Sequence, residues 1–353
     1  MGYFFTSFLK ILGYLFGIVF FIIFLAIFGY LLGNKKEEYF LYSDGKIDSD
    51  KQIAILKLNG PIISEPNPLN NFDFLQNIEV IYPALIKNYL EELSEKDIHG
   101  LIVSINSPGG SVSATKKTYD LLSNFKLKKN IPIYFHTTDI LASGGYWLAL
   151  SGDKIFASYG AILGSIGVKG PDWLYYNTPT LISQGLLGPS IESPKGIKLY
   201  SNSAGISKDL FNPFRAPSKD EIFKLQIIVN DIYNDFVNII SSKRKIEADF
   251  IKETIGAMIY NTKSAKKNFL IDNEKDIDSV IKSLAENLQI QNYKIISNQN
   301  IKKNFLSINK LKGYLRSNLT NERKNQIKNK FCNNLNNELS AVSVTVYNNY
   351  CHN

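Results

Sequence analysis

The chain begins with a long apolar run and then alternates between hydrophobic patterns of strand and helix type. Residues 11–33 contain no charged side chain. At about 1.5 Å of rise per residue, a helix of this length spans a hydrocarbon core of about 30 Å. The run is longer than the apolar region of a cleaved signal peptide. We therefore predict an uncleaved transmembrane anchor at residues 11–33, with a short flank at 1–10 and a polar linker at 34–50.

After the linker, strand and helix patterns alternate. Apolar runs stopped by Gly, Pro or Asn predict strands at residues 52–58, 99–105, 131–136 and 154–157. Apolar residues at helical spacing predict helices at residues 78–93, 112–125, 219–242, 249–255, 264–269 and 275–288. A further helix is expected to begin at Ser143, and residues 341–347 could form a late strand. This alternation predicts an α/β fold with a parallel sheet, with its site at the carboxyl ends of the strands.

Charge is concentrated at the C-terminal end. The net charge is +8, and residues 301–353 contain nine Lys/Arg against two Asp/Glu, which gives that stretch +7. The rest of the chain is nearly neutral, so a nucleic-acid partner is not expected. We predict a catalytic domain at 51–290, in which 171–205 form an irregular segment, and a basic, Asn/Lys-rich tail at 291–353. The tail is expected to be solvated, with contact to anionic lipid as an alternative.

Cysteine and histidine usage excludes several kinds of chemistry. Cys332 and Cys351 both lie in the tail, where they could pair only in an oxidising compartment. The three histidines, His99, His136 and His352, do not form a cluster with metal-ligand spacing. We expect neither a cysteine nucleophile nor a metal ion nor another cofactor.

Three Gly-rich motifs follow one another within residues 104–168. They are Asn106-Ser107-Pro108-Gly109-Gly110, Ala142-Ser143-Gly144-Gly145-Tyr146 and Gly164-Ser165-Ile166-Gly167-Val168. A serine hydroxyl attacks a carbonyl carbon when a base accepts its proton and N–H donors stabilise the oxyanion. We interpret Ser143 as the nucleophile, the Gly109-Gly110 turn as a source of N–H donors, and Ser165 as a positioning hydroxyl.

The base is less clearly indicated than the nucleophile. His136 lies seven residues before Ser143, but a histidine at the end of a strand is more often structural. A lysine can serve if it is neutral, which requires a pKa well below the usual value of about 10.4. The residues alone leave three lysines open: Lys195, Lys198 and Lys208.

Taken together, the motifs resemble those of the signal peptide peptidase A family, which are membrane-anchored Ser-Lys proteases with a Clp-protease/crotonase-like fold. The resemblance covers about residues 50–290. It implies that Ser143 is the nucleophile, that Ser165 orients the lysine, and that Gly109 and Gly110 contribute to the oxyanion hole. Several family members carry Pro-Phe five residues after the lysine, and Pro213-Phe214 stand in that place after Lys208. The resemblance therefore favours Lys208 as the general base.

What the resemblance implies for function is equally specific. It implies an endopeptidase with an acyl-enzyme mechanism, anchored in the cell membrane as a homo-oligomer with its catalytic domain on the extracytoplasmic side. The implied substrates are hydrophobic peptides such as remnant signal peptides. An alignment that places Ser203 at the lysine position would instead make the chain a non-catalytic, membrane-anchored scaffold. Acyl-CoA chemistry of the crotonase type is a third possibility, but no basic phosphate cradle is visible for it.

Overall fold

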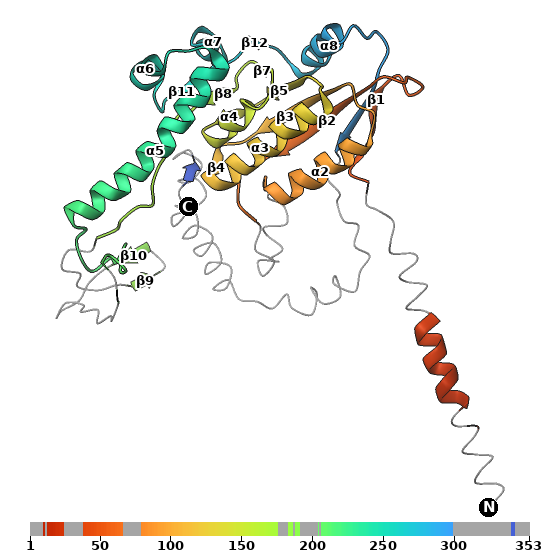
Figure 1. Cartoon of the computed structure of the whole chain (residues 1–353), viewed down its shortest axis with the longest axis horizontal. Helices are drawn as coiled ribbons and strands as arrows, with labels where there is room; N and C mark the ends of the chain where they lie inside the picture. The colour runs from red at the N-terminus through yellow and green to blue at the C-terminus, as the bar shows by residue number, and fades with distance from the viewer. Residues whose placement is uncertain are drawn as a thin grey trace, which may run out of the picture. The chain divides into compact units, whose positions relative to one another are not determined.

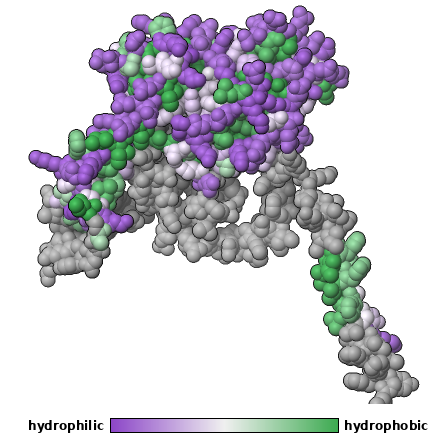
Figure 2. Space-filling model, in the orientation of Figure 1, coloured by the Kyte–Doolittle hydropathy of each residue, from purple (hydrophilic) through white to green (hydrophobic). Residues whose placement is uncertain are grey.

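The computed structural model describes residues 10, 13–24, 38–65, 79–175, 183–185, 188–190, 204, 206–298 and 340–342. It contains two compact units, Met1–Tyr39 and Phe40–Asn353, which are treated separately. In the first unit, residues 13–24 are helical and their apolar side chains are exposed (Figure 2). No helix among the described residues is long and apolar enough to cross a membrane. Residues 11, 12 and 25–33 of the predicted anchor lie outside the described residues.

The second unit is built on a seven-stranded sheet in the order β1-β13-β2-β3-β5-β7-β12 (Figure 1). All neighbouring strands are parallel except β1 and β13, which are antiparallel. This arrangement confirms the predicted α/β class. The strands are β1 (Phe40–Gly45), β2 (Gln52–Asn59), β3 (Gly100–Asn106), β5 (Ile133–Thr137), β7 (Lys154–Ala157), β12 (Asn273–Glu274) and β13 (Lys294–Asn298).

Two strands of this sheet were not expected. β1 lies within the stretch interpreted as a linker, and β13 lies beyond residue 290. In β1 only Phe40 is buried, so the strand has no hydrophobic alternation by which the sequence could reveal it. β13 is short, and its place in the sheet is set by its pairing with β2 on one side and β1 on the other. The folded body of the chain therefore extends from Phe40 to Asn298.

Helices cover both faces of the sheet. Buried residues of α8 (Ile277–Asn287), among them Val280 and Leu284, pack against Ile55, Ile102 and Phe156 on one face. Because successive strand side chains point to opposite faces, the alternate residues point toward the other face. On that side lie α2 (Pro83–Glu95) and α3 (Val112–Lys129) (Figure 1).

The remaining helices follow the predictions with shifted ends. α2 begins at Pro83 rather than at residue 78, because proline is suited to the first helical position. α3 continues to Lys129 and ends at Asn130, which has the left-handed conformation common after helices. The other helices are α4 (Gly144–Ala149), α5 (Lys219–Arg244), α6 (Ala248–Phe250), the π-helix η3 (Ile251–Ile255) and α7 (Thr262–Lys267).

Smaller sheets carry the motifs. β6 (Ile140–Ala142), β8 (Ile162–Gly164) and β11 (Ile259–Asn261) form a three-stranded sheet in the order β11-β8-β6. β9 (Ser183–Gly185) pairs with β10 (Gly188–Ser190) within the irregular segment, most of which lies outside the described residues. β4 (Gly109–Ser111) pairs with β14 (Ser340–Val342), part of the late strand predicted at 341–347.

Candidate active site

Ser143 occupies a sharp turn between a strand and a helix. It follows β6 and precedes α4, with φ of 54° and ψ of −122°. Positive φ is costly for a residue other than glycine, so the surrounding bonds must hold it. The Ser143 N–H donates to the Gly164 carbonyl at 2.8 Å, and its carbonyl accepts from the Trp147 N–H at 2.9 Å. The side chain makes no capping hydrogen bond, which leaves the hydroxyl available for chemistry.

The Gly109-Gly110 turn forms β4 and lies against the start of α4. The Ile62 N–H donates to the Gly109 carbonyl at 2.9 Å, and the Ser111 N–H donates to the Ile62 carbonyl at 2.8 Å. Successive peptide groups of a strand point in opposite directions, so the N–H and carbonyl of Gly110 point away from Ile62. The Gly109 N–H donates to Ser107 Oγ at 3.2 Å. Of the two glycines, Gly110 therefore has the N–H that faces the site.

Close packing around α4 explains the Gly pair after Ser143. A Cβ on Gly144 would be 2.6 Å from Thr115 Oγ1 and 3.4 Å from the Gly110 nitrogen. A Cβ on Gly145 would be 2.8 Å from the Ser107 carbonyl oxygen. Only glycine lets the first turn of α4 approach Thr115 and Ser107 so closely. This packing brings Gly144, a residue that sequence reasoning did not single out, close to the Gly110 nitrogen.

The far side of α4 is fixed by two aromatic residues. The Tyr146 hydroxyl donates to the Leu270 carbonyl at 2.7 Å, and burial raises the pKa of Tyr146. The Trp147 ring stacks on Phe236 of α5, with centroids 4.6 Å apart and planes at 11°. Such a stacked pair contributes about 0.5–1.5 kcal/mol beyond the area that it buries. The helix that follows Ser143 is therefore held on both sides.

Ser165 lies beside Ser143, as the sequence predicts. β6 and β8 are parallel with Ala142 opposite Gly164, so the two serines follow neighbouring strands at the same level. Ser165 also has positive φ, 52°, and its N–H donates to the Met258 carbonyl at 2.8 Å. The structure thus brings together Ser143, Ser165 and the Gly109-Gly110 turn.

Lys208 is not part of this group within one chain. It is exposed, and in the described residues it forms no hydrogen bond with Ser143 or Ser165. Its neighbour Asp209 accepts from Arg215 at 2.7 Å, and Arg215 also donates to Glu221 at 2.7 Å. Hydrogen bonds from Arg215 lower the pKa of both carboxyl groups. This network fixes the Lys208 segment at the first turn of α5.

The length of α5 separates that turn from Ser143. α5 contacts α4 through Phe236, and Glu221 lies fifteen residues earlier, about 22 Å along the helix axis. The chain after Ser165 runs along α5 toward the N-terminal end of that helix. A Cβ on Gly170 would be 3.1 Å from Val229 Cγ2, and Trp173 Nε1 donates to the Asn212 carbonyl at 3.1 Å. Figure 1 shows the N-terminal end of α5 lying away from α4 and β4.

Some predicted residues lie outside the described residues. These are the alternative bases Lys195 and Lys198, Ser203 of the alternative alignment, and the tail residues Cys332 and Cys351.

His136 has a structural environment. Its side chain is fully buried, and Nε2 lies 3.1 Å from Ser158 Oγ and 3.2 Å from the Lys275 carbonyl oxygen. Among the residues that the structure describes, Nδ1 has no hydrogen-bond partner and no hydrogen bond connects the ring to Ser143. Burial lowers the pKa of His136, while the Lys275 carbonyl and Asp276 oppose that effect. The ring is therefore a neutral part of the interior and not the base of a Ser-His pair.

We expect His136 to make stability depend on pH. Its pKa is lower in the folded protein than the usual 6.5, so the unfolded chain binds the proton more strongly. The contribution of the neutral His136 ring to the free energy of unfolding is fully present above pH 6.5. It is lost as pH falls through the lowered folded-state pKa, by at most about 1.4 kcal/mol per pH unit. In urea unfolding between pH 7.5 and 5, His136→Gln should lose less stability than the unchanged protein. Equal pH slopes for the two proteins would contradict this prediction.

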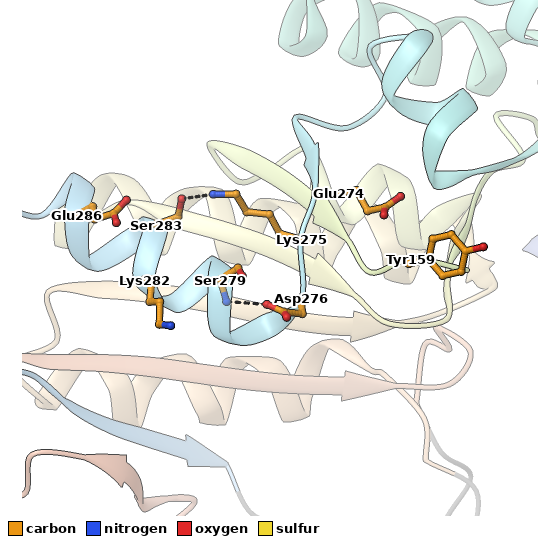
Figure 3. Close-up of a pocket in the computed structure, with 8 residues that line it drawn as sticks. All are labelled: Tyr159, Glu274, Lys275, Asp276, Ser279, Lys282, Ser283 and Glu286. Atoms are coloured by element: carbon orange, nitrogen blue, oxygen red, sulfur yellow. Dashed lines mark hydrogen bonds between the residues drawn. The ribbon is translucent and has the colours of Figure 1, made fainter.

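A polar hollow of about 550 Å³ lies elsewhere, beside β12 and α8 (Figure 3). In it Lys275 points toward Ser283, and Asp276 accepts the Ser279 N–H at 2.8 Å. None of the residues predicted for the active site lines this hollow. Its lining residues are Tyr159, Glu274, Lys275, Asp276, Ser279, Lys282, Ser283 and Glu286.

Comparison with known proteins assigns the family. The model of peptidase family S49 matches residues 125–179 and 181–291. A Methanocaldococcus jannaschii protein that carries the name of a protease is 30% identical over 232 residues, which are 64% of this chain and 70% of that protein. The chain belongs to peptidase family S49.

Other relatives are similar over comparable lengths. An Enterococcus faecium protein named for the signal peptide peptidase SppA is 28% identical over 259 residues, which are 73% of this chain and 70% of that protein. Among solved structures, a mutant of the 1510-N membrane-bound stomatin-specific protease in complex with a substrate peptide has a TM-score of 0.43 and 16% identity. That likeness covers 75% of this chain and 97% of the other.

Proposed function

We propose that the chain is a membrane-anchored serine endopeptidase that cleaves hydrophobic peptides, with remnant signal peptides among its substrates. The observation that carries the proposal is the conformation of Ser143. Ser143 stands at a strained strand-to-helix turn with an uncapped side chain, Ser165 follows the neighbouring strand, and the next residue, Gly144, lies close to the Gly110 nitrogen. Membership of a peptidase family supports the reaction class, and the name of the Enterococcus faecium relative supports the substrate.

In the proposed mechanism, Lys208 in its neutral form accepts the Ser143 hydroxyl proton while Oγ attacks the carbonyl carbon of the peptide bond. Ser165 orients the amine of Lys208. The N–H groups of Gly110, with its neighbour Gly109 shaping the turn, and of Gly144 stabilise the oxyanion. The protonated lysine then gives its proton to the leaving amine, and water hydrolyses the acyl-enzyme. Neither a metal ion nor a cofactor takes part.

The position of Lys208 leads us to propose that the dyad forms between two copies of the chain. Removing water from an amine favours its neutral form. Lys208 is exposed in a single chain, so an interface with a second copy would be needed to bury its amine. Apolar side chains are exposed on the same half of α5 (Figure 2), which supports an interface there. They are Ile222, Phe223, Ile227 and Ile228. If a second copy covered this half of α5, Lys208 of the first copy would be buried beside Ser143 of the second copy.

The anchor and its location complete the proposal. The apolar run at 11–33, of which 13–24 are helical with exposed apolar side chains, supports attachment to the cell membrane. We place the catalytic domain on the extracytoplasmic side, where spent signal peptides leave the membrane. Lipid is then a partner of the first unit and peptides are partners of the second.

A fluorophosphonate probe tests the proposal against the non-catalytic scaffold. We expect a single adduct on Ser143, found by peptide mapping of the labelled full-length protein, because the proposed base and oxyanion donors would activate this serine. Ser143→Ala should abolish labelling. Ser113→Ala, which removes a nearby exposed serine, should not change it. Absence of labelling in the unchanged protein would support the non-catalytic scaffold and contradict the peptidase proposal.

A further inference from the structure

A segment of the C-terminal tail is seated on the strand that borders the candidate nucleophile. β14 pairs antiparallel with β4, with Ser340 opposite Ser111, Ala341 opposite Gly110, and Val342 opposite Gly109. In Figure 1, β14 is the blue arrow beside β4. Beyond Asn298, the structure describes residues 340–342 alone.

The edge that β14 occupies is the one that an extended peptide needs. The opposite edge of β4 is already bonded to the N–H and carbonyl of Ile62. The free edge presents the N–H and carbonyl of Gly110, and the Gly110 nitrogen lies beside Gly144, the residue after Ser143. A strand added to this edge therefore passes over the nucleophile. Addition of a strand to an exposed edge is a common way to bind peptides, because main-chain hydrogen bonds supply affinity for any sequence.

The sequence of the segment is suited to that position. Most of the tail is rich in Asn, Lys and Arg, but residues 339–347 read Leu-Ser-Ala-Val-Ser-Val-Thr-Val-Tyr and contain no charge. Alternation of small or hydroxyl side chains with valine favours an extended strand. The segment thus has the backbone preference and the apolar character that we propose for the substrates.

We infer that residues 340–342 are an intramolecular ligand of the active site that competes with peptide substrates for β4. The inference rests on the proposed peptidase function for its effect on catalysis, and on the β4–β14 pairing for its binding. A covalently attached ligand competes at an effective concentration of roughly a millimolar or below. A competitor of this kind raises the apparent KM for substrate and leaves kcat unchanged.

Breaking the strand tests the inference. Ala341→Pro removes the N–H opposite Gly110 and fixes φ near −65°, which opposes pairing. In full-length protein of verified intact mass, this variant should cleave an apolar quenched-fluorescence peptide with a KM roughly two- to tenfold lower at unchanged kcat. Lys310→Pro, a proline in the same tail outside the paired residues, should leave KM unchanged. Equal KM values for Ala341→Pro and the unchanged protein would overturn the inference.

A binding experiment separates this inference from the peptidase proposal. In the Ser143→Ala background, a fluorescent synthetic peptide of residues 337–347 is titrated and its anisotropy is measured. We expect tighter binding, by a similar two- to tenfold, when Ala341→Pro is added to Ser143→Ala. This result would uphold the tail as a ligand even if no peptide were cleaved by any variant. Unchanged binding would refute it even if Ser143 proved to be the nucleophile.

Discussion

Ser143→Ala should lower kcat for cleavage of an apolar peptide by at least about 10³-fold, with the fold intact. The side chain of Ser143 makes no capping hydrogen bond, so its removal costs no structural contact of that kind. Lys208→Met should have a comparable effect, because the serine then loses the group that accepts its proton. The measurement is steady-state cleavage, with circular dichroism as the control for folding. Wild-type rates in both variants would refute the dyad.

Combining these two variants locates the lysine. If Lys208 acts on the Ser143 of a neighbouring copy, co-expression of Ser143→Ala and Lys208→Met chains creates some intact sites. With random assembly, about a quarter of the sites receive both groups, so about a quarter of the original rate should return. The control is a mixture of the separately assembled variants, kept under conditions that prevent subunit exchange. No recovery after co-expression, despite demonstrated mixed oligomers, would place the base within the same chain.

Gly144→Ala should reduce kcat by about 10²-fold, even though alanine is the better helix former. The added Cβ would lie 2.6 Å from Thr115 Oγ1 of α3, so the first turn of α4 must move away from α3 and carry Ser143 with it. A shift of about 1 Å between the nucleophile and its oxyanion donors is sufficient for such a loss. The variant is assayed by cleavage and by its rate of fluorophosphonate labelling.

A second substitution can attribute this loss to packing. Thr115→Ala removes two of the three atoms that would lie nearest the added Cβ, which are Oγ1 at 2.6 Å and Cγ2 at 3.4 Å. Adding it to Gly144→Ala should therefore restore most of the activity, while Thr115→Ala alone is the matched control. If the double variant were as inactive as Gly144→Ala, the close approach of α4 to Thr115 of α3 would not explain the glycine.

That Ser143, Ser165 and the Gly109-Gly110 turn lie near one another could be predicted, because each has a local signal in the sequence. Gly109-Gly110, Ser143 and Ser165 each follow a strand, and the carboxyl ends of parallel strands meet at one edge. The sequence could not reveal that Gly109 uses its N–H on Ser107 Oγ and that Gly110 faces the site, because this depends on Ile62, almost fifty residues earlier. It also could not indicate the Gly144 contact with Thr115.

The least predictable parts are those whose role depends on distant partners. β1 and β13 carry little hydrophobic pattern of their own, and their pairing joins residues some 250 positions apart. The proposed base, Lys208, is similar, because its place beyond the N-terminal end of a long helix has no local spacing to Ser143 that the sequence could show. The Arg215 network that fixes this end of α5 consists of ordinary charged residues, which sequence reasoning assigns to the surface.

The position of β13 between β1 and β2 has a consequence for the order of events at the ribosome. β1 and β2 leave the ribosome early, yet β1 lacks its partner in the sheet, and β2 has only β3 of its two partners, until Lys294–Asn298 has been synthesised. All residues proposed for the chemistry, including Ser143 and Lys208, are translated before that point. The sheet that supports them is therefore completed late, after both of these residues have been synthesised. The residues proposed for the chemistry thus gain a complete supporting sheet only after β13 has been made.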